Sequence, residues 1–141
     1  GKTALDINLE KVVVPVKVGD DLAKVFDIKV IYFDLDKSII RSDAAKDLAK
    51  IVEVMKQNPE MKVDVRSHTD SRASKAYNKA LSERRAQATI SWMIKQGISS
   101  DRLTAKGYGE SELTNKCSDN VPCTEVEHQA NRRSEFIIKK L

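Results

Sequence analysis

Long apolar runs, aromatic side chains and cysteine are all scarce in this sequence. Of its 141 residues only 5% are aromatic, and it has two cysteines, five glycines and three prolines. No run of 18 or more apolar residues occurs, which excludes a membrane-spanning helix of ordinary length. A basic stretch followed by an apolar stretch is also missing, and the chain starts at Gly1. We therefore expect a processed or excised piece whose targeting signal is absent.

The balance of charge gives little support to a nucleic-acid partner. Lysine and arginine number 25 against 21 acidic residues, so the net charge is only +4. Aromatic side chains on which bases could stack are few. We interpret the positive charge as a solvated basic surface and predict no nucleic-acid binding. The length and the periodic apolar pattern indicate a single ordered domain.

Apolar periodicity predicts alternating strands and helices. Alternating valines from Val12 to Val18, interrupted by Pro15, predict an edge strand or extended arm. The rest of the chain reads strand, helix, strand, helix, strand, loop, strand, and predicts an α/β (α+β) sandwich in which two main helices cover a βαβαββ-type mixed sheet. The predicted strands are 30–33, 61–65, 103–106 and 134–140, and the predicted helices are 43–57 and 75–96.

The second helix carries polar residues that could form a site. Its expected apolar stripe is Tyr77, Leu81, Ala88 and Trp92. Asn78 and Arg85 lie about 20° apart around the helix axis, at the edge of that stripe, because seven residues make nearly two turns.

Asp70, in the polar loop 67–74 before this helix, is a candidate neighbour of Arg85. Two interpretations stay open. Asp70 and Arg85 form a structural ion pair, or they receive a zwitterion, with Asp70 taking its ammonium and Arg85 its carboxylate.

An enzymatic alternative rests on Asp34 and Asp36. A DxD motif after an apolar strand resembles the nucleophile motif of haloacid-dehalogenase-type phosphatases, which use magnesium. However, Ser38 stands where that motif usually has threonine or valine, and no second pair of acidic residues follows. A solvated acidic turn is the simpler interpretation.

Cys117 and Cys123 predict a disulfide rather than a metal site. Together with His68, Asp70 and His128 they suggest zinc, but the two-residue spacing of a zinc ribbon is missing. A disulfide would close a short ring and tie down a long loop, which implies a secreted or periplasmic setting. We predict no catalytic set, no metal and no cofactor.

Several motifs occur together in one order. They are Phe33-Asp34-Leu35-Asp36-Lys37-Ser38, His68-Thr69-Asp70-Ser71, Tyr77-Asn78, Leu81-Ser82-Glu83-Arg84-Arg85-Ala86, Gly107-Tyr108-Gly109-Glu110 and Asn131-Arg132-Arg133. This set resembles the OmpA C-terminal (OmpA/MotB/Pal-like) peptidoglycan-binding family over residues 28–141. Because the DxD lies inside the larger pattern, the resemblance weakens the phosphatase interpretation.

The resemblance implies an OmpA-like fold and non-covalent binding of the peptidoglycan stem peptide through its diaminopimelate. By position, Asp70 would take the ammonium of diaminopimelate and Arg85 its carboxylate, while Asn78 would add hydrogen bonds. Leu81 would pack under the ligand. Three further residues would border the pocket: Thr69, Leu35 and Asp36. The resemblance gives His68 a role in stabilising the fold.

Some features depart from the family pattern. Ser67 replaces a usual glycine, and Ser134 replaces a usual valine. An insertion around residues 115–126, which carries both cysteines, resembles the longer loop of family members from Bacteroidetes-like outer-membrane proteins. The resemblance implies a module on the periplasmic face of a Gram-negative outer membrane, tethered through an N-terminal barrel or lipid anchor outside this chain. Residues 1–27 would be a linker or edge-strand arm. A flagellar stator domain is a further alternative, and the oligomeric state is not determined.

Overall fold

The computed structural model describes residues 5–9, 12–25 and 40–141. The predicted strand at 30–33 lies outside these residues, as do Asp34, Leu35 and Asp36. The described strands are β1 (Leu5–Leu9), β2 (Val12–Val16), β3 (Lys62–Ser67), β4 (Leu103–Gly107) and β5 (Ser134–Lys140). The described helices are α1 (Leu22–Val25), α2 (Ser42–Gln57), α3 (Lys75–Lys95) and α4 (Glu125–Gln129), with a short 3-10 turn at Ser100–Arg102.

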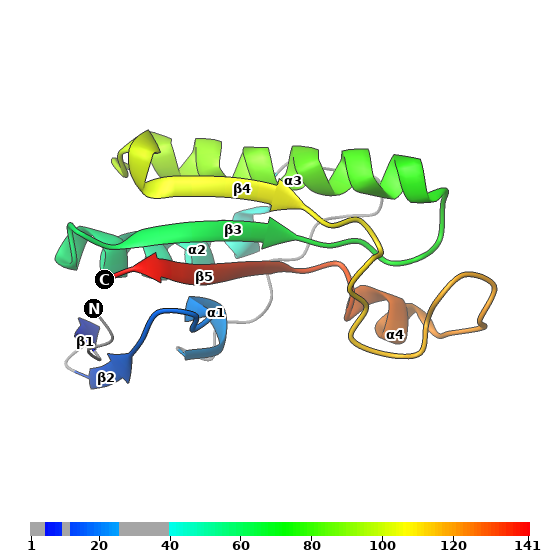
Figure 1. The fold of residues 1–141 in the computed structure, drawn as a ribbon, viewed down its shortest axis with the longest axis horizontal. Helices are drawn as coiled ribbons and strands as arrows, with labels where there is room; N and C mark the ends of the chain where they lie inside the picture. The colour runs from blue at the N-terminus through cyan, green and yellow to red at the C-terminus, as the bar shows by residue number, and fades with distance from the viewer. Residues whose placement is uncertain (1–4, 10–11, 26–39) are drawn as a thin grey trace.

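A mixed three-stranded sheet forms the centre of the described fold. The strand order is β4-β3-β5, with β3 parallel to β4 and antiparallel to β5. Figure 1 shows α3 running alongside β4, as the crossover helix between two parallel strands must. The predicted mixed α/β class is confirmed, and from α2 onward the elements follow the predicted order. Two short helices, α1 and α4, were not predicted.

The helices cover one face of this sheet. Along β3 the side chains alternate, so that Val63 and Val65 are buried while Asp64 and Arg66 point to the more open face. Leu48 and Met55 of α2 and Met93 of α3 share the apolar core with these valines. No helix among the described residues combines the length and apolarity needed to cross a bilayer.

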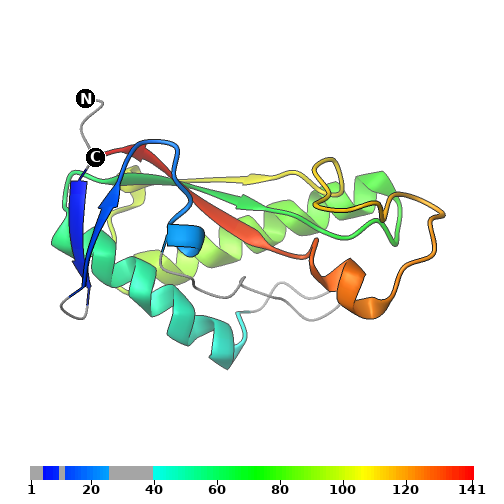
Figure 2. The ribbon, with the colours of Figure 1, turned by 90° about the horizontal axis from the view of Figure 1, so that it is seen from below.

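The segment before residue 26 packs onto the edge of the sheet. β1 and β2 form a separate antiparallel pair, which Figure 2 shows beside α2. Further along, the backbone of Gly19 and Asp20 exchanges hydrogen bonds with Ile138 of β5, at 2.8 and 2.9 Å. Val16 and Leu22 belong to the apolar core. The described part of this segment therefore contributes side chains to the apolar core. The domain boundary at residue 27 stays a prediction.

The buried face of α3 differs from the predicted apolar stripe. Leu81 is buried as expected, but Tyr77 is 39% exposed and Ala88 and Trp92 are only half-buried. The helix instead buries a largely polar face, made of Asn78, Leu81, Ser82, Arg85, Ala86, Thr89 and Met93. The stripe was wrong because apolar periodicity treats Asn78 and Arg85 as surface residues.

Close packing of α3 on β4 depends on the absence of a side chain at Gly107. A Cβ atom there would overlap the backbone of Ser82 and Glu83. Ser82 also accepts a hydrogen bond from the backbone of Gly109, at 2.8 Å. The glycine therefore lets the helix approach the end of the strand, where the next loop begins.

Ser67 and Ser134, the two serines that the resemblance marks as departures from the family pattern, pair with each other. Ser67 and Ser134 are register partners on β3 and β5, and both are buried. Their hydroxyl oxygens lie 2.9 Å apart and share a hydrogen bond. Ser67 on β3, expected to replace a glycine, therefore has its hydrogen-bond partner in Ser134 on β5, expected to replace a valine.

We expect Ser67→Ala and Ser134→Ala each to lower the free energy of unfolding by about 1–2 kcal/mol, because each leaves one buried hydroxyl without its partner. The double variant should lose less than the sum of the two. Urea unfolding of all four proteins measures this coupling, and strictly additive losses would contradict the pairing.

Candidate functional site

The carboxyl ends of β3 and β4, the start of α3 and the start of β5 meet at one end of the sheet (Figure 1). The chain leaving β3 is held there on both sides. The backbone of His68 donates to Arg133, at 2.8 Å, and that of Thr69 donates to Gly109, at 2.9 Å. These bonds continue the strand pairing past the end of β3 and fix the position of Asp70.

Asp70 is a buried carboxylate, 4% exposed, with two arginine partners. Its Oδ2 lies 2.9 Å from Nη2 of Arg72 and 2.7 Å from Nη1 of Arg132, and its Oδ1 accepts from the backbone of Arg72 at 2.9 Å. Burial alone would raise the pKa of Asp70, but the hydrogen bonds from Arg72 and Arg132 hold that pKa below its ordinary value. Asp70 is therefore ionised at neutral pH.

Asn78 connects Asp70 to the loop after β4. Its side-chain Nδ2 donates to the main-chain oxygen of Asp70 at 3.1 Å and to Oε1 of Glu110 at 2.9 Å. Burial, and then the neighbouring Asp119, raise the pKa of Glu110. The structure thus brings the side chain of Asn78 to the backbone of Asp70.

Leu81 and Arg85 continue the same buried face of α3, one and two turns after Asn78. Arg85 is 1% exposed and is among the largest fully buried side chains of the described residues. Among the described residues, Asp70 forms its ion pairs with Arg72 and Arg132. These two arginines occupy the place that the structural interpretation gave to Arg85.

Thr69 and His68 are also buried beside Asp70. The Thr69 hydroxyl donates to the main-chain oxygen of Asp70 at 2.9 Å, so its side chain holds the loop. His68 bonds to Glu135 through Nε2, at 2.9 Å, and stacks on Tyr108 with ring centroids 5.3 Å apart. These contacts agree with a fold-stabilising role for His68. The two other pocket residues, Leu35 and Asp36, lie outside the described part of the chain.

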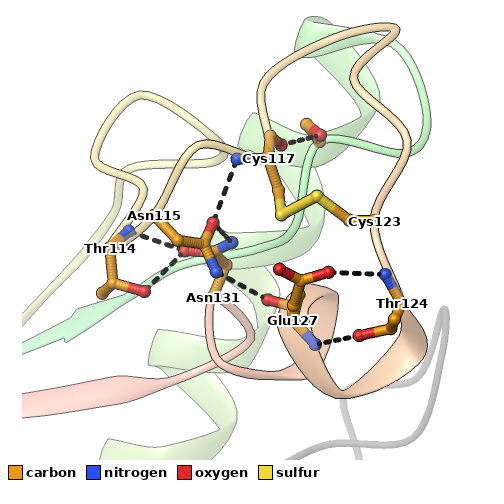
Figure 3. Close-up of a disulfide and its surroundings, with 8 residues drawn as sticks. Thr114, Asn115, Cys117, Cys123, Thr124, Glu127 and Asn131 are labelled. Carbon is orange, nitrogen blue, oxygen red and sulfur yellow. Dashed lines mark hydrogen bonds between the residues drawn. A yellow bond between two sulfur atoms is a disulfide. The ribbon is translucent and has the colours of Figure 1, made fainter.

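The predicted disulfide between Cys117 and Cys123 is present, and it closes the loop between β4 and α4 (Figure 3). The main-chain oxygen of Cys117 accepts from the hydroxyl of Ser71, next to Asp70. Cys117, Cys123 and Glu127 place three possible metal-ligand atoms within 4.8 Å, but the bonded sulfurs are not thiolates.

A network of amides fastens this loop to the start of β5 (Figure 3). The side chain of the buried Asn131 accepts from Thr114 at 2.7 Å and donates to Asn115 at 2.9 Å. Asn115 in turn binds the backbone of Cys117 and of Glu127. The loop is therefore anchored immediately before Arg132.

Three charged residues of this site were not predicted: Arg72, Arg132 and Glu125. Glu125, the first residue of α4, forms ion pairs with both arginines, at 2.8 and 3.0 Å. A sequence signal existed for α4, because Thr124 and Glu127 have the spacing of a capping box, which the structure contains. Arg132 lay inside the quoted Asn-Arg-Arg motif, but its partner could not be identified without the fold.

Comparison with known proteins gives related sequences and folds. The family model described as "OmpA family" matches residues 32–125. Outer membrane porin F of Pseudomonas fluorescens is 39% identical over 107 residues, covering 76% of this chain and 31% of that protein. A peptidoglycan-associated lipoprotein of Brucella melitensis is 34% identical over 87 residues, covering 62% of this chain and 52% of that protein.

A solved structure shares the fold. The peptidoglycan-associated lipoprotein from Burkholderia pseudomallei superposes with a TM-score of 0.69 at 22% identity, covering 77% of this chain and 87% of that chain. These likenesses define an α/β domain that makes up about a third of porin F and about half of the Brucella lipoprotein. The chain belongs to the OmpA family, which confirms the resemblance drawn from its motifs.

Asp70→Asn should lower the free energy of unfolding by about 3 kcal/mol at pH 7, because the buried Arg132 loses a charged partner. Since the pKa of Asp70 is lowered by folding, its contribution is full above about pH 4 and is lost as the pH falls through the lowered pKa. The difference from the parent should therefore shrink as the pH falls below about 4.

Chemical denaturation at a series of pH values tests this. Asp43→Asn is the matched control, because Asp43 pairs with Arg41 at an exposed position, 68% exposed, and should cost about 1 kcal/mol or less. A difference for Asp70→Asn that does not change with pH would contradict the assignment.

Replacing both Cys117 and Cys123 by serine should lower the free energy of unfolding by about 2 kcal/mol, because the closed ring limits the unfolded chain. Urea unfolding with and without a reducing agent measures the effect. The parent should respond to the reductant and the double variant should not. An equal response in both would show that the disulfide is not the cause.

Proposed function

We propose that this chain binds peptidoglycan non-covalently through the diaminopimelate of the stem peptide and so anchors an outer-membrane protein to the cell wall. The observation that supports this best is family membership over residues 32–125. This span includes His68-Thr69-Asp70, Asn78 and Arg84-Arg85. The name of the Brucella relative, peptidoglycan-associated lipoprotein, agrees with it. The proposed place is the periplasmic face of a Gram-negative outer membrane.

The chemistry of three buried residues, Asp70, Asn78 and Arg85, suits a zwitterion. In a stem peptide, one end of diaminopimelate keeps a free ammonium and a free carboxylate. Asp70 would take the ammonium, Arg85 would take the carboxylate through paired N–H groups, and Asn78 would add hydrogen bonds. Leu81 would pack beneath the ligand, while Thr69, Leu35 and Asp36 would border it.

Burial of this cluster has two consequences for binding. Asp70 and Arg85 are 4% and 1% exposed, so a ligand reaches them only after a local rearrangement. Once formed, the ligand contacts would lie in a region of low effective dielectric, where ion pairs are stronger than at the surface.

The enzymatic alternative gains no support. The matching family is the OmpA family rather than a phosphatase family. Asp34 and Asp36 lie outside the described residues. We therefore propose a binding module that is not an enzyme.

Co-sedimentation with purified diaminopimelate-type peptidoglycan tests the proposal. Arg85→Ala should abolish pelleting, because losing one charged partner of a buried contact costs about 2–5 kcal/mol of binding. Arg84→Ala is the matched control, since it removes the same charge from the exposed neighbour and should pellet like the parent.

Two further measurements make the result decisive. Circular dichroism shows whether Arg85→Ala is folded, and Arg85→Lys keeps the charge but loses the paired N–H geometry. Free diaminopimelate should compete with peptidoglycan for the parent. Specific recognition would be contradicted if Arg84→Ala and Arg85→Ala lost pelleting equally, or if free diaminopimelate did not compete with peptidoglycan.

A further inference from the structure

Glu125 bridges two arginines with its two carboxylate oxygens. Oε1 lies 2.8 Å from Nη2 of Arg72, and Oε2 lies 3.0 Å from Nη2 of Arg132. The two guanidinium groups therefore form a receptor for one carboxylate, and a residue of the cysteine-bearing insertion fills it.

The arginines are fixed from the other side by Asp70. Its Oδ2 contacts Arg72 at 2.9 Å and Arg132 at 2.7 Å, and the side chains of Asp70 and Arg132 are each 6% exposed. The Glu125 side chain, by contrast, is 60% exposed. Glu125 itself lies at the surface, and its pair with Arg72, whose side chain is 40% exposed, is of the weak exposed kind. When Glu125 leaves, Asp70 still holds both guanidinium groups in place.

Space for a ligand lies beside this receptor. A hollow of about 390 Å³ is lined by Arg72, by its neighbours Ser71 and Ala73, by Ser118–Val121 of the disulfide loop and by His128. A chain that reached Arg72 along this hollow would come within one residue's length of Asp70, since Arg72 contacts Asp70 directly.

We propose that Arg72 and Arg132 form a second carboxylate subsite, which Glu125 occupies in the unliganded protein and which a further carboxylate of the stem peptide takes on binding. The inference rests on the proposed function. The peptide that carries diaminopimelate has a free carboxylate on the adjacent γ-linked glutamyl residue, so one ligand offers a group to each subsite. Glu125 thus sets the preference between stem peptides in which that carboxylate is free and those in which it is amidated.

Calorimetric titration with two synthetic tripeptides tests the subsite. Both contain alanine, a γ-linked glutamyl residue and diaminopimelate, and they differ only in whether the glutamyl carboxylate is free or amidated. The parent should prefer the free peptide. Glu125→Gln should bind the free peptide about two- to fivefold more tightly than the parent does and should bind the amidated peptide as the parent does, because no internal carboxylate has to be displaced.

Two variants serve as controls. Glu112→Gln removes the same charge from an exposed position in the same loop and should leave both affinities unchanged. Arg72→Gln keeps Asp70 paired with Arg132 and should abolish the preference for the free peptide.

The outcomes separate the two proposals. Equal affinity of the parent for both peptides, unchanged in Glu125→Gln, would overturn the subsite and leave the proposed function intact. Failure of both peptides to bind the parent would overturn the proposed function and the subsite with it.

Discussion

The buried carboxylate of Asp70 is the group on which the rest of the site depends. Without its negative charge, the buried guanidinium of Arg132 would keep, among the ion pairs of the described residues, only the one with the exposed Glu125. Through its arginines and through Asn78, Asp70 connects the loop after β3 to α3, to α4 and to the start of β5. Burying a charge is costly unless it is paired, and this requirement holds four separate segments of chain in one arrangement.

The cysteine-bearing insertion is part of this arrangement. The disulfide closes the loop, and the amide network around Asn131 fastens it to the turn between α4 and β5 (Figure 3). Glu125 forms ion pairs with both arginines that contact Asp70. An insertion that departs from the family pattern therefore reaches the charged cluster directly. It adds a negative charge at the rim of a site whose inner residues follow the family motif.

Much of the fold could be predicted because most elements bury apolar side chains, and these side chains recur in the sequence at the spacing of a helix or of a strand. Strand β5 was predicted with its observed bounds, and α2 and α3 within one residue. The prediction failed on the inner face of α3, because Asn78 and Arg85, which it placed at the edge of an apolar stripe, are both buried. Arg72 is only two residues from Asp70, but Arg132 is 62 residues away along the chain, and no local pattern encodes that pairing. Helix spacing and loop position singled out Asp70, Asn78 and Arg85, whereas the other candidate residues came from the family resemblance. The roles of all of them as ligand contacts stay predictions.

The central claim is that the cluster around Asp70 and Arg85 recognises a zwitterion. The most direct test is an NMR titration of 15N-labelled protein that follows the Nε–H of Arg85 and the side-chain amide of Asn78. Diaminopimelate should shift both signals saturably, whereas lysine blocked at its α-amino and α-carboxyl groups, which keeps only the side-chain ammonium, should shift neither at the same concentrations. An equal response to the two compounds, or a protein that binds peptidoglycan while both signals stay unmoved, would contradict the account.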